Sequence, residues 1–258
     1  MLLDIRTLSV YEDEKRNQKE DERIKKTAGR YDFVTFLSEE MRNKIGFSRD
    51  KSAIVPLGAD VISTSAKVYI PIKLLYVGTF MNRKLDRTLE GLKRFVDNNP
   101  TAQIEYHIVG DAGMNHRDVE TRLQDYVDQS GLGSIVFFHG RIPNKDLKPL
   151  FDLCNVGVSF VPITPYFDFQ PVTKTFEYAM SGLYVIATKT FENRQVIDER
   201  NGILIGDTPD SFANALQYIY ENNERFDEQV VRNSLSDYLW STIENKRMYP
   251  VLDALFNE

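Results

Sequence analysis

The stretch KLLYVGTFMNRKLDRTLEGLKRF (73–95) decides the fold. An apolar run of strand length, 73–78, leads through a glycine-containing loop into 85–99, where apolar residues recur at helical spacing. This alternation indicates βαβ units and a parallel sheet, so we expect residues 73–235 to form a complete doubly wound α/β domain. Further strand patterns at 106–110, 134–140, 155–162, 183–188 and 201–205 alternate with helical patterns at 116–130, 144–154, 171–181 and from Thr208 onward.

The chain on either side of this domain is less regular. Residues 1–60 offer only three strand patterns, so we expect a partial Rossmann-like domain there, followed by a linker at 61–72. A long helical pattern at 227–247 is resumed by VLDALF (251–256). We therefore expect 236–258 to form a C-terminal helix that packs back toward the first domain. The strands expected in the first domain are at 2–6, 31–38 and 53–60, the last of them broken at Pro56 and Gly58. The helices expected there are a highly charged one at 11–26, whose plainest interpretation is a solvated surface, and one at 39–45.

Composition excludes several classes of protein. The chain has 258 residues, 42% of them hydrophobic and 27% charged, which is typical of a globular protein. A net charge of −6 argues against a nucleic-acid binder. One cysteine, Cys154, permits no internal disulfide, and the start lacks the features of a signal peptide. We expect a cytoplasmic protein, with the inner face of the membrane as an alternative place of action.

Two segments could bind an anion at the carboxyl ends of the strands, where open α/β sheets bind their ligands. The loop GTFMNRKLD (78–86) places Arg83 and Lys84 directly before a helix, an arrangement that suits a pyrophosphate. The alternative is that both are surface charges. The segment 162–182 is richer, because a proline-led helix there carries several polar side chains in its first turns.

In that second helix, Thr173 and Lys174 could bind a phosphate together with the free N–H groups of its first turn. Glu177 lies one turn further and could accept hydrogen bonds from a diol such as a ribose. The alternative is an ion pair between Lys174 and Glu177 that faces solvent. The glycine loop at 110–115 lacks the complete G-x-G-x-x-G pattern, and the three histidines lack metal-ligand spacing, so neither NAD nor a metal is expected.

Residues 31–256 resemble the carboxyl-terminal part of a group 1 (family 4) glycosyltransferase with the GT-B fold. The resemblance rests on several motifs that occur in the family's order. These motifs are YDFVTFLSEEMRNKIG (31–46), IVPLGAD (54–60), KLLYVGTFMNRKLDRTLEGL (73–92), YHIVGDAG (106–113), VFFHGRIPNKDLKPLF (136–151), TKTFEYAMSGLYVIAT (173–188) and NGILIGDTPDSFANAL (201–216).

The resemblance implies two Rossmann-like domains that face a cleft, with a nucleotide-sugar donor bound mainly to the second. It implies that Glu177 holds the ribose hydroxyls, that Lys84 belongs to the diphosphate-binding pair, and that Gly140 and Arg141 meet the nucleobase. The residues expected to be catalytic are Arg83, Lys84, Lys174 and Glu177. Of these, the three cations, together with the N–H groups of 172–175, are expected to stabilise the leaving group. Those expected to bind the donor are Gly78, Thr79, Gly110, Gly140, Arg141, Asp168, Phe169, Pro171, Val172, Thr173 and Glu177.

The sequence departs from the family pattern at several positions. The arginine of the diphosphate-binding pair falls at Thr79, so we expect Arg83 to substitute for it. The first glutamate of the family's E-x7-E motif falls at Phe169, with Asp168 one residue out of register. The family's glycine-rich loop and its histidine have no counterpart before His107, which predicts that most of the first domain is missing.

The resemblance therefore predicts an enzyme of polysaccharide biosynthesis. It would transfer a hexose, with retention, from a nucleotide diphosphate sugar to a glycan or lipid-linked acceptor, without a cofactor. The alternative is a catalytically incomplete fragment that binds a nucleotide sugar and lacks most of the acceptor domain. Expected partners are the donor, the acceptor, and either a second copy of the chain or a separate N-terminal half. A GT-B epimerase is disfavoured, because its acid and base residues have no counterpart here.

Overall fold

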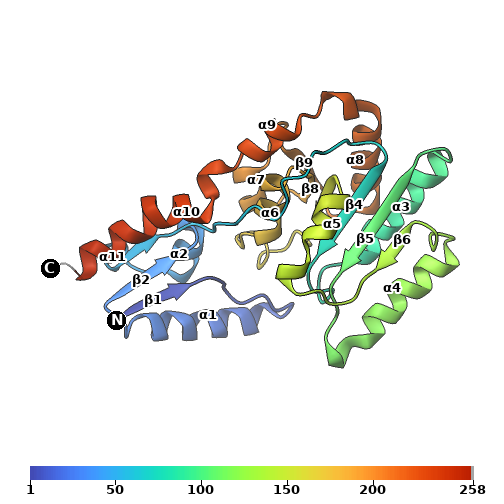
Figure 1. Cartoon of the computed structure of the whole chain (residues 1–258). Coiled ribbons are helices and arrows are strands. Elements are labelled where there is room, and N and C mark those ends of the chain that lie inside the picture. The colour runs from blue at the N-terminus through green and yellow to red at the C-terminus, as the bar shows by residue number, and fades with distance from the viewer. Residues whose placement is uncertain (257–258) are drawn as a thin grey trace.

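The computed structural model describes residues 1–256, which form two separate parallel sheets (Figure 1). The larger sheet has the strand order β6-β5-β4-β7-β8-β9. The order reverses between β4 and β7, and open sheets bind ligands at such a point. This architecture confirms the expected α/β fold class. The six strands are β4 (Ile72–Val77), β5 (Ile104–Val109), β6 (Val136–Phe138), β7 (Val156–Ser159), β8 (Tyr184–Thr188) and β9 (Gly202–Ile205).

Helices cover the larger sheet on both faces (Figure 1). On one side α3 packs against α4 and, most extensively, against α8. Close approach of α3 to α8 requires a glycine, because a Cβ on Gly91 would lie 2.6 Å from the carbonyl oxygen of Pro209. The helices on this side are α3 (Leu85–Asn98), α4 (Arg117–Gln129) and α8 (Pro209–Asn222), and those on the other are α5 (Lys148–Leu153), α6 (Thr173–Met180) and α9 (Glu228–Asn233).

The smaller sheet has the order β1-β2-β3 and its own apolar core. Phe36 and Met41 are at the centre of this core and are fully buried. The side chains of Asp13 and Ser38 cap the two helices of this part by accepting hydrogen bonds from backbone N–H groups in their first turns. The elements are β1 (Leu2–Ile5), β2 (Phe33–Phe36), β3 (Ser52–Ile54), α1 (Glu14–Ala28) and α2 (Glu39–Ile45).

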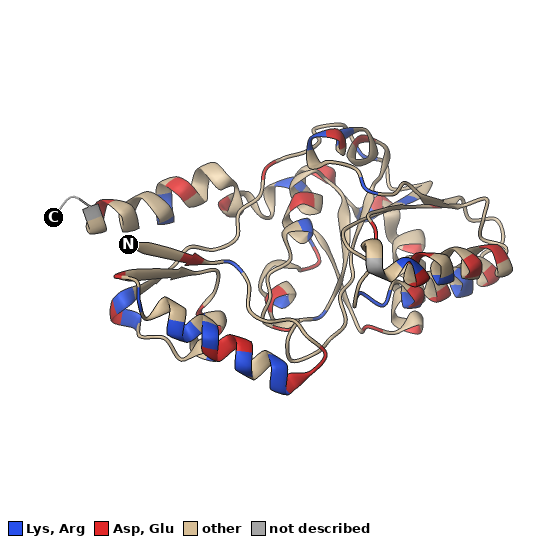
Figure 2. Cartoon of the chain, turned by 90° about the horizontal axis from the view of Figure 1, so that it is seen from below, with Lys and Arg blue, Asp and Glu red and all other residues tan. Residues whose placement is uncertain are grey.

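The chain passes twice between the two parts, and the two crossings lie side by side. Ala59 pairs with Leu239, and the backbone N–H of Trp240 donates to the carbonyl of Ala59 at 3.1 Å. The indole of Trp240 packs so closely on Gly58 that a Cβ there would lie 2.7 Å from the ring. Beyond this crossing, α10 (Trp240–Ile243) and α11 (Tyr249–Phe256) lie beside the smaller sheet (Figures 1 and 2).

The expected linker at 61–72 runs along the surface of the larger part and is fixed to it. Arg232 donates to the carbonyls of Ser63 and Ser65, at 2.6 and 2.5 Å. The hydroxyl oxygen of Ser181 accepts from the backbone N–H of Ile62 at 3.1 Å. These hydrogen bonds hold the linker against the larger part along a defined path.

Three sequence expectations about the elements need correction. The helix expected at 227–247 is divided, because Leu239 pairs with Ala59 at the crossing. A 3₁₀ turn, Ser236–Tyr238, separates α9 from α10. A π turn, Glu244–Met248, then leads into α11. The strand at 53–60, expected to break at Pro56 and Gly58, already ends at Ile54. One helix, α7 (Phe191–Val196), was not expected at all. The final two residues of the expected 236–258 helix lie outside the described residues.

No helix within residues 1–256 combines the length and the apolar character that crossing a membrane would require.

Candidate active site

A cavity of about 380 Å³ lies where the strand order reverses. This volume falls within the range of small-molecule sites. Both parts of the chain contribute to its wall, the larger one mainly through the end of β4 and the start of α6. The lining residues are Arg6, Thr7, Val10, Tyr76, Val77, Gly78, Thr79, Arg83, Val161, Phe167, Gln170, Pro171, Val172, Thr173, Lys174 and Glu177.

A smaller hollow of about 210 Å³ adjoins this cavity and shares the end of β4 with it. Here the backbone N–H of Gly110 donates to the carbonyl of Gly140 at 2.8 Å. Gly110 has φ +135°, and a Cβ at this position would collide with the carbonyl of Gly78. The three predicted glycines therefore meet at adjacent strand ends, with Arg141 lining the same hollow.

Helix α6 is fixed firmly to the sheet beneath the cavity. The Thr175 hydroxyl lies 2.6 Å from that of Ser159 on β7 and donates to Asn193 at 3.1 Å. Val172, at the N-cap, supplies no side-chain hydrogen bond to the first turn of the helix. The first-turn N–H groups and the exposed Thr173 therefore lie at the cavity wall, where the helix dipole favours an anion.

Lys174 is buried beneath this helix tip, with its Nζ 3.7 Å from the centroid of the Tyr76 ring. Burial lowers the pKa of Lys174 well below its usual value, and the nearby charge of Arg83 lowers this pKa further. An ammonium in this position is poorly compensated. An anionic ligand would supply the missing charge.

Glu177 lies one turn further along α6 and lines the same cavity. Burial raises its pKa, and the charge of Asp60 adds to this effect, while Lys174 opposes it. Among the described residues, the ion pairs do not include one between Lys174 and Glu177. The geometry therefore disfavours the solvent-facing ion pair that was the alternative for these two residues.

Arg83 reaches the cavity from the loop after β4. Its guanidinium carbon lies 4.4 Å from the centroid of the Phe167 ring, a cation–π contact. Burial lowers the pKa of Arg83, but an arginine remains charged in proteins. The neighbours Asn82 and Lys84 have φ of 54° and 52°, a conformation that costs of order 1 kcal/mol or more per residue. This loop conformation directs Arg83 into the cavity and Lys84 into a separate hollow.

Other predicted site residues lie elsewhere. Lys84 is exposed and lines a separate hollow with His116 and Asp118. The carboxylate of Asp168 accepts from the backbone N–H of Phe191 at 2.7 Å, so it fixes the start of α7. Phe169 packs against the ring of Phe191 and lines a groove beside α1. The geometry thus gives these three side chains positions outside the cavity, and the roles expected for them find no support in it.

Several residues of the cavity wall were not expected from the sequence. Arg6 and Thr7 follow β1 directly, so the rule that ligands bind at the carboxyl ends of strands could have indicated them. Gln170 is buried and accepts a hydrogen bond from Thr7 across the two parts at 3.3 Å. Tyr76 is inside a strand and could not be distinguished from a core residue. Within residues 1–256, no three His, Cys, Asp or Glu side chains gather as ligands for a metal.

The profile of the family described as glycosyl transferases group 1 matches residues 71–222, more than half of the chain. The chain belongs to the group 1 glycosyltransferases. The resemblance of the sequence to this family is thereby confirmed. No curated protein matches the chain.

Solved structures share the GT-B fold of this group 1 glycosyltransferase. Anabaena HepE in complex with UDP aligns with a TM-score of 0.76 at 16% identity, over 98% of this chain and 72% of that one. Sucrose-phosphate synthase from Thermosynechococcus elongatus aligns at 0.77 and 21% identity, over 99% and 68%. A glycosyltransferase from Rickettsia africae aligns at 0.77 and 12% identity, over 100% and 71%.

Proposed function

We propose that this glycosyltransferase binds a nucleotide diphosphate sugar in the 380 Å³ cavity and transfers its hexose, with retention, to a glycan or lipid-linked acceptor. One observation carries the proposal: the tip of α6, Arg83 and Lys174 all face one cavity, with Glu177 one turn away. This combination suits a diphosphate beside a ribose diol. HepE, which shares the fold, has been crystallised with UDP-glucose.

The chemistry that this wall supports is stabilisation of the leaving group. When the bond between the sugar and the diphosphate breaks, its electron pair goes to the departing phosphate oxygen. The acceptor hydroxyl supplies the new oxygen, and its proton passes to the departing nucleotide or to solvent. Arg83, Lys174 and the N–H groups of α6 neutralise the charge that develops on the phosphate. Charged hydrogen bonds of this kind contribute roughly 1.5–3 kcal/mol each.

The test is calorimetric titration of UDP, GDP and their glucose derivatives against the wild type and Glu177→Ala. We expect the variant to bind the preferred nucleotide about tenfold more weakly or worse, because it loses hydrogen bonds to a charged acceptor. The control is Glu221→Ala, which removes an exposed carboxylate on α8. Equal affinities of Glu177→Ala and the wild type would remove Glu177 from the site. Tight binding without transfer to any acceptor would favour a role in binding alone.

A further inference from the structure

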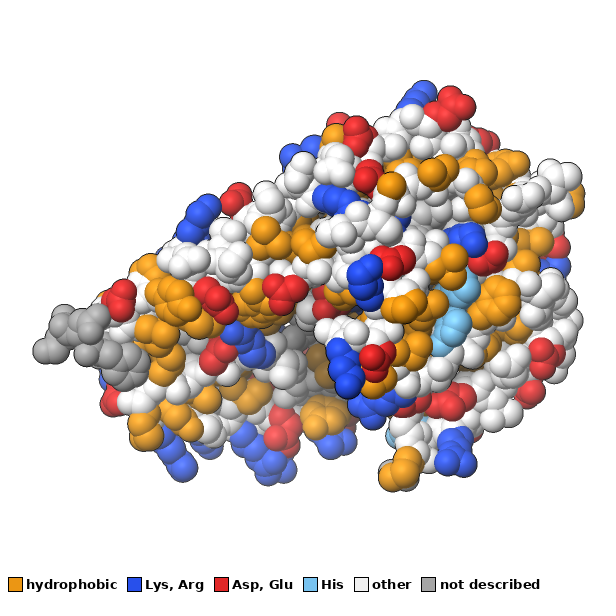
Figure 3. Space-filling model, in the orientation of Figure 1, with side chains coloured by type: hydrophobic (Ala, Val, Ile, Leu, Met, Phe, Trp, Pro, Cys, Tyr) orange, Lys and Arg blue, Asp and Glu red, His pale blue; other side chains and the backbone are white. Residues whose placement is uncertain are grey.

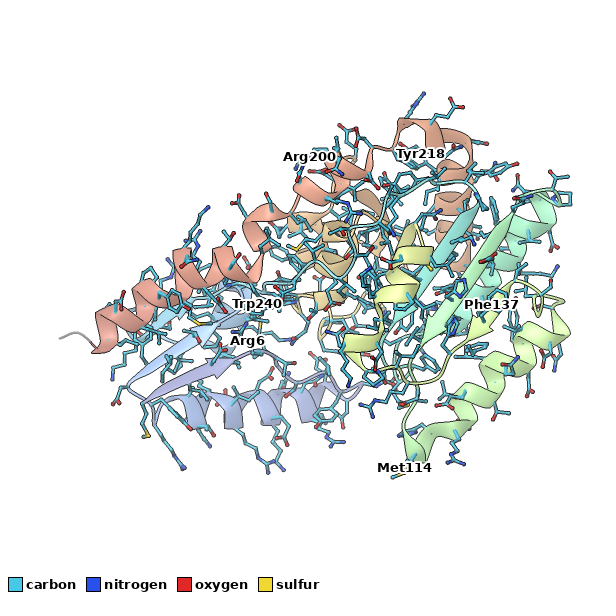
Figure 4. All side chains as sticks on the ribbon, viewed as in Figure 1. Arg6, Met114, Phe137, Arg200, Tyr218 and Trp240 are labelled. Atoms are coloured by element: carbon cyan, nitrogen blue, oxygen red, sulfur yellow. The ribbon has the colours of Figure 1, made fainter. Side chains whose placement is uncertain are left out.

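Arg6 brings a positive charge to the cavity from the smaller part of the chain. It follows the last residue of β1 and lines the same cavity as Arg83 and Lys174, which belong to the larger part. Figure 4 shows Arg6 beside Trp240, where the two parts adjoin. The cavity is therefore bordered by cations from both sides.

The position of Arg6 is fixed by contacts within the smaller part and at the crossing. Its Nε donates to the carboxylate of Asp4, whose other oxygen accepts from Thr35 at 2.7 Å. Its guanidinium carbon lies 5.3 Å from the centroid of the Trp240 ring. Trp240 is in turn packed on Gly58. A side chain held by two partners that are themselves fixed is prepared to bind before a ligand arrives.

These contacts leave the guanidinium able to bind an anion. A guanidinium has five N–H donors in a rigid fork, and the ion pair with Asp4 engages Nε. The pair is partly exposed, and such pairs contribute little to stability. Stability alone is therefore a weak reason for an arginine at the cavity wall, whereas recognition of phosphate oxygens is a task that arginine performs well.

We propose that Arg6 is a catalytic residue that binds the diphosphate of the donor from the side opposite α6. The proposal rests on the function proposed above, since it assumes a diphosphate at the tip of α6. Asp4 and Trp240 act as positioning residues for the guanidinium. With Arg6 in this role, the donor bridges the two parts of the chain, and the leaving group is neutralised from both sides of the cleft.

The experiment compares Arg6→Ala, Arg6→Lys and the wild type by calorimetric titration of UDP and GDP, with inorganic pyrophosphate as a competitor. We expect Arg6→Ala to weaken binding of the preferred nucleotide about 10- to 100-fold, the range for loss of a charged hydrogen bond. Competition by pyrophosphate should weaken in parallel. Arg6→Lys should restore part of the affinity, since it keeps the charge but loses the fork. The matched control is Arg30→Ala, which removes an exposed arginine of the same part and should bind like the wild type.

Salt dependence provides a readout that a merely structural role would not change. Binding of Arg6→Ala should respond less steeply to added salt than binding of the wild type, because one charge contact is lost. Near-UV circular dichroism confirms that the variant is folded. If Arg6→Ala binds like Arg30→Ala while Glu177→Ala binds weakly, the inference on Arg6 fails and the proposed function stands. If the wild type binds neither nucleotide, both fail.

Discussion

At the scale of single residues, the site is defined by two ionisable groups that the fold buries at some cost. Lys174 and Glu177 both have pKa values moved by burial toward their neutral forms. Buried charges without compensation are destabilising. A ligand with phosphates and hydroxyls would supply the compensating charge and hydrogen bonds. We therefore expect that replacing these side chains raises the free energy of unfolding and weakens binding of the donor.

Lys174→Met tests this opposition. The variant replaces a poorly compensated ammonium with an apolar chain of similar length, so we expect a gain in the free energy of unfolding of about 1–3 kcal/mol at neutral pH. In the wild type the unfolded chain binds more protons than the folded one between the lowered pKa of Lys174 and about 10.4. The free energy of unfolding should therefore rise with pH over that window. Urea titrations at several pH values should show this slope flattened in the variant, and a less stable variant at neutral pH would contradict the argument.

Donor affinity should depend on pH in the opposite sense. An anion beside Lys174 raises its pKa, so binding of UDP-glucose takes up a proton at pH values between the lowered pKa of the free protein and the higher pKa of the complex. Affinity should strengthen as the pH falls toward the pKa of the free protein and level off below it. UDP-glucose is the suitable probe, because its phosphodiester groups do not titrate near neutral pH. Calorimetry in buffers with different ionisation enthalpies measures the uptake. No proton uptake in the wild type, or the same uptake in Lys174→Met, would count against this role.

The sequence indicated part of this site, for reasons that differ from residue to residue. Lys174 and Glu177 could be found because helical spacing fixes their relation to one helix tip. Lys84 was expected beside Arg83 but lines a separate hollow, because its direction depends on the positive φ angles of the loop, which the sequence does not reveal. Arg6 was not assigned to the cavity, although it directly follows a strand, because its place in the wall depends on how the two parts of the chain adjoin.

At the scale of elements, a close contact with a glycine of the sheet adds to the hydrogen bonds that fix the position of α6. Tyr178 of α6 packs closely on Gly157 of β7, and its hydroxyl oxygen accepts from the backbone N–H of Val77 at 2.8 Å. The same helix carries Lys174 and Glu177 to the cavity. The packing of α6 on β7 therefore also sets the positions of Lys174 and Glu177 in the site.

We expect Gly157→Ala to disturb both the packing of α6 on the sheet and the geometry of the site. A Cβ on Gly157 would lie 2.3 Å from Cγ of Tyr178, so the helix must shift. We expect a loss of about 1–3 kcal/mol in the free energy of unfolding, as for other overpacked cores, together with weaker nucleotide binding. The control is Gly133→Ala, where the nearest neighbour is 3.9 Å away and the effect should be small. Unchanged melting and affinity in Gly157→Ala would show that α6 is not fixed in this way.

Elements with a long, clear period could be predicted, and the others could not. Strands β4 and β5 and helix α3 match their sequence patterns closely, because each buries a regular apolar face. Helix α7 has six residues, too few to establish a period. The break before α10 is invisible in the sequence, since it is imposed by the pairing of Leu239 with Ala59.

At the scale of the whole molecule, the surface is hollowed where the two parts meet (Figure 3). The chain has one tryptophan, Trp240, and it lies at the crossing between the parts. Its indole contacts the Arg6 guanidinium, which lines the cavity. The fluorescence of Trp240 should therefore respond to a ligand that binds in the cavity.

We expect saturating UDP-glucose to change the emission of Trp240, because the Arg6 guanidinium beside the ring would bind the phosphate oxygens of the ligand. Arg6→Ala should shift the unliganded emission to longer wavelength, since water replaces the cation over the ring. Trp240→Phe removes the signal and serves as the blank. Binding that calorimetry detects without any change in emission would show that the crossing does not respond to the ligand.

The double crossing also affects how the protein is made. The β1–β3 sheet is synthesised early, yet the helices beside it, α10 and α11, leave the ribosome only after the whole larger part has been translated. The larger part is one uninterrupted segment and can fold as a unit during translation. The smaller part is completed last, so a nascent chain halted before residue 239 would hold the whole larger part and a β1–β3 sheet without α10 and α11 beside it.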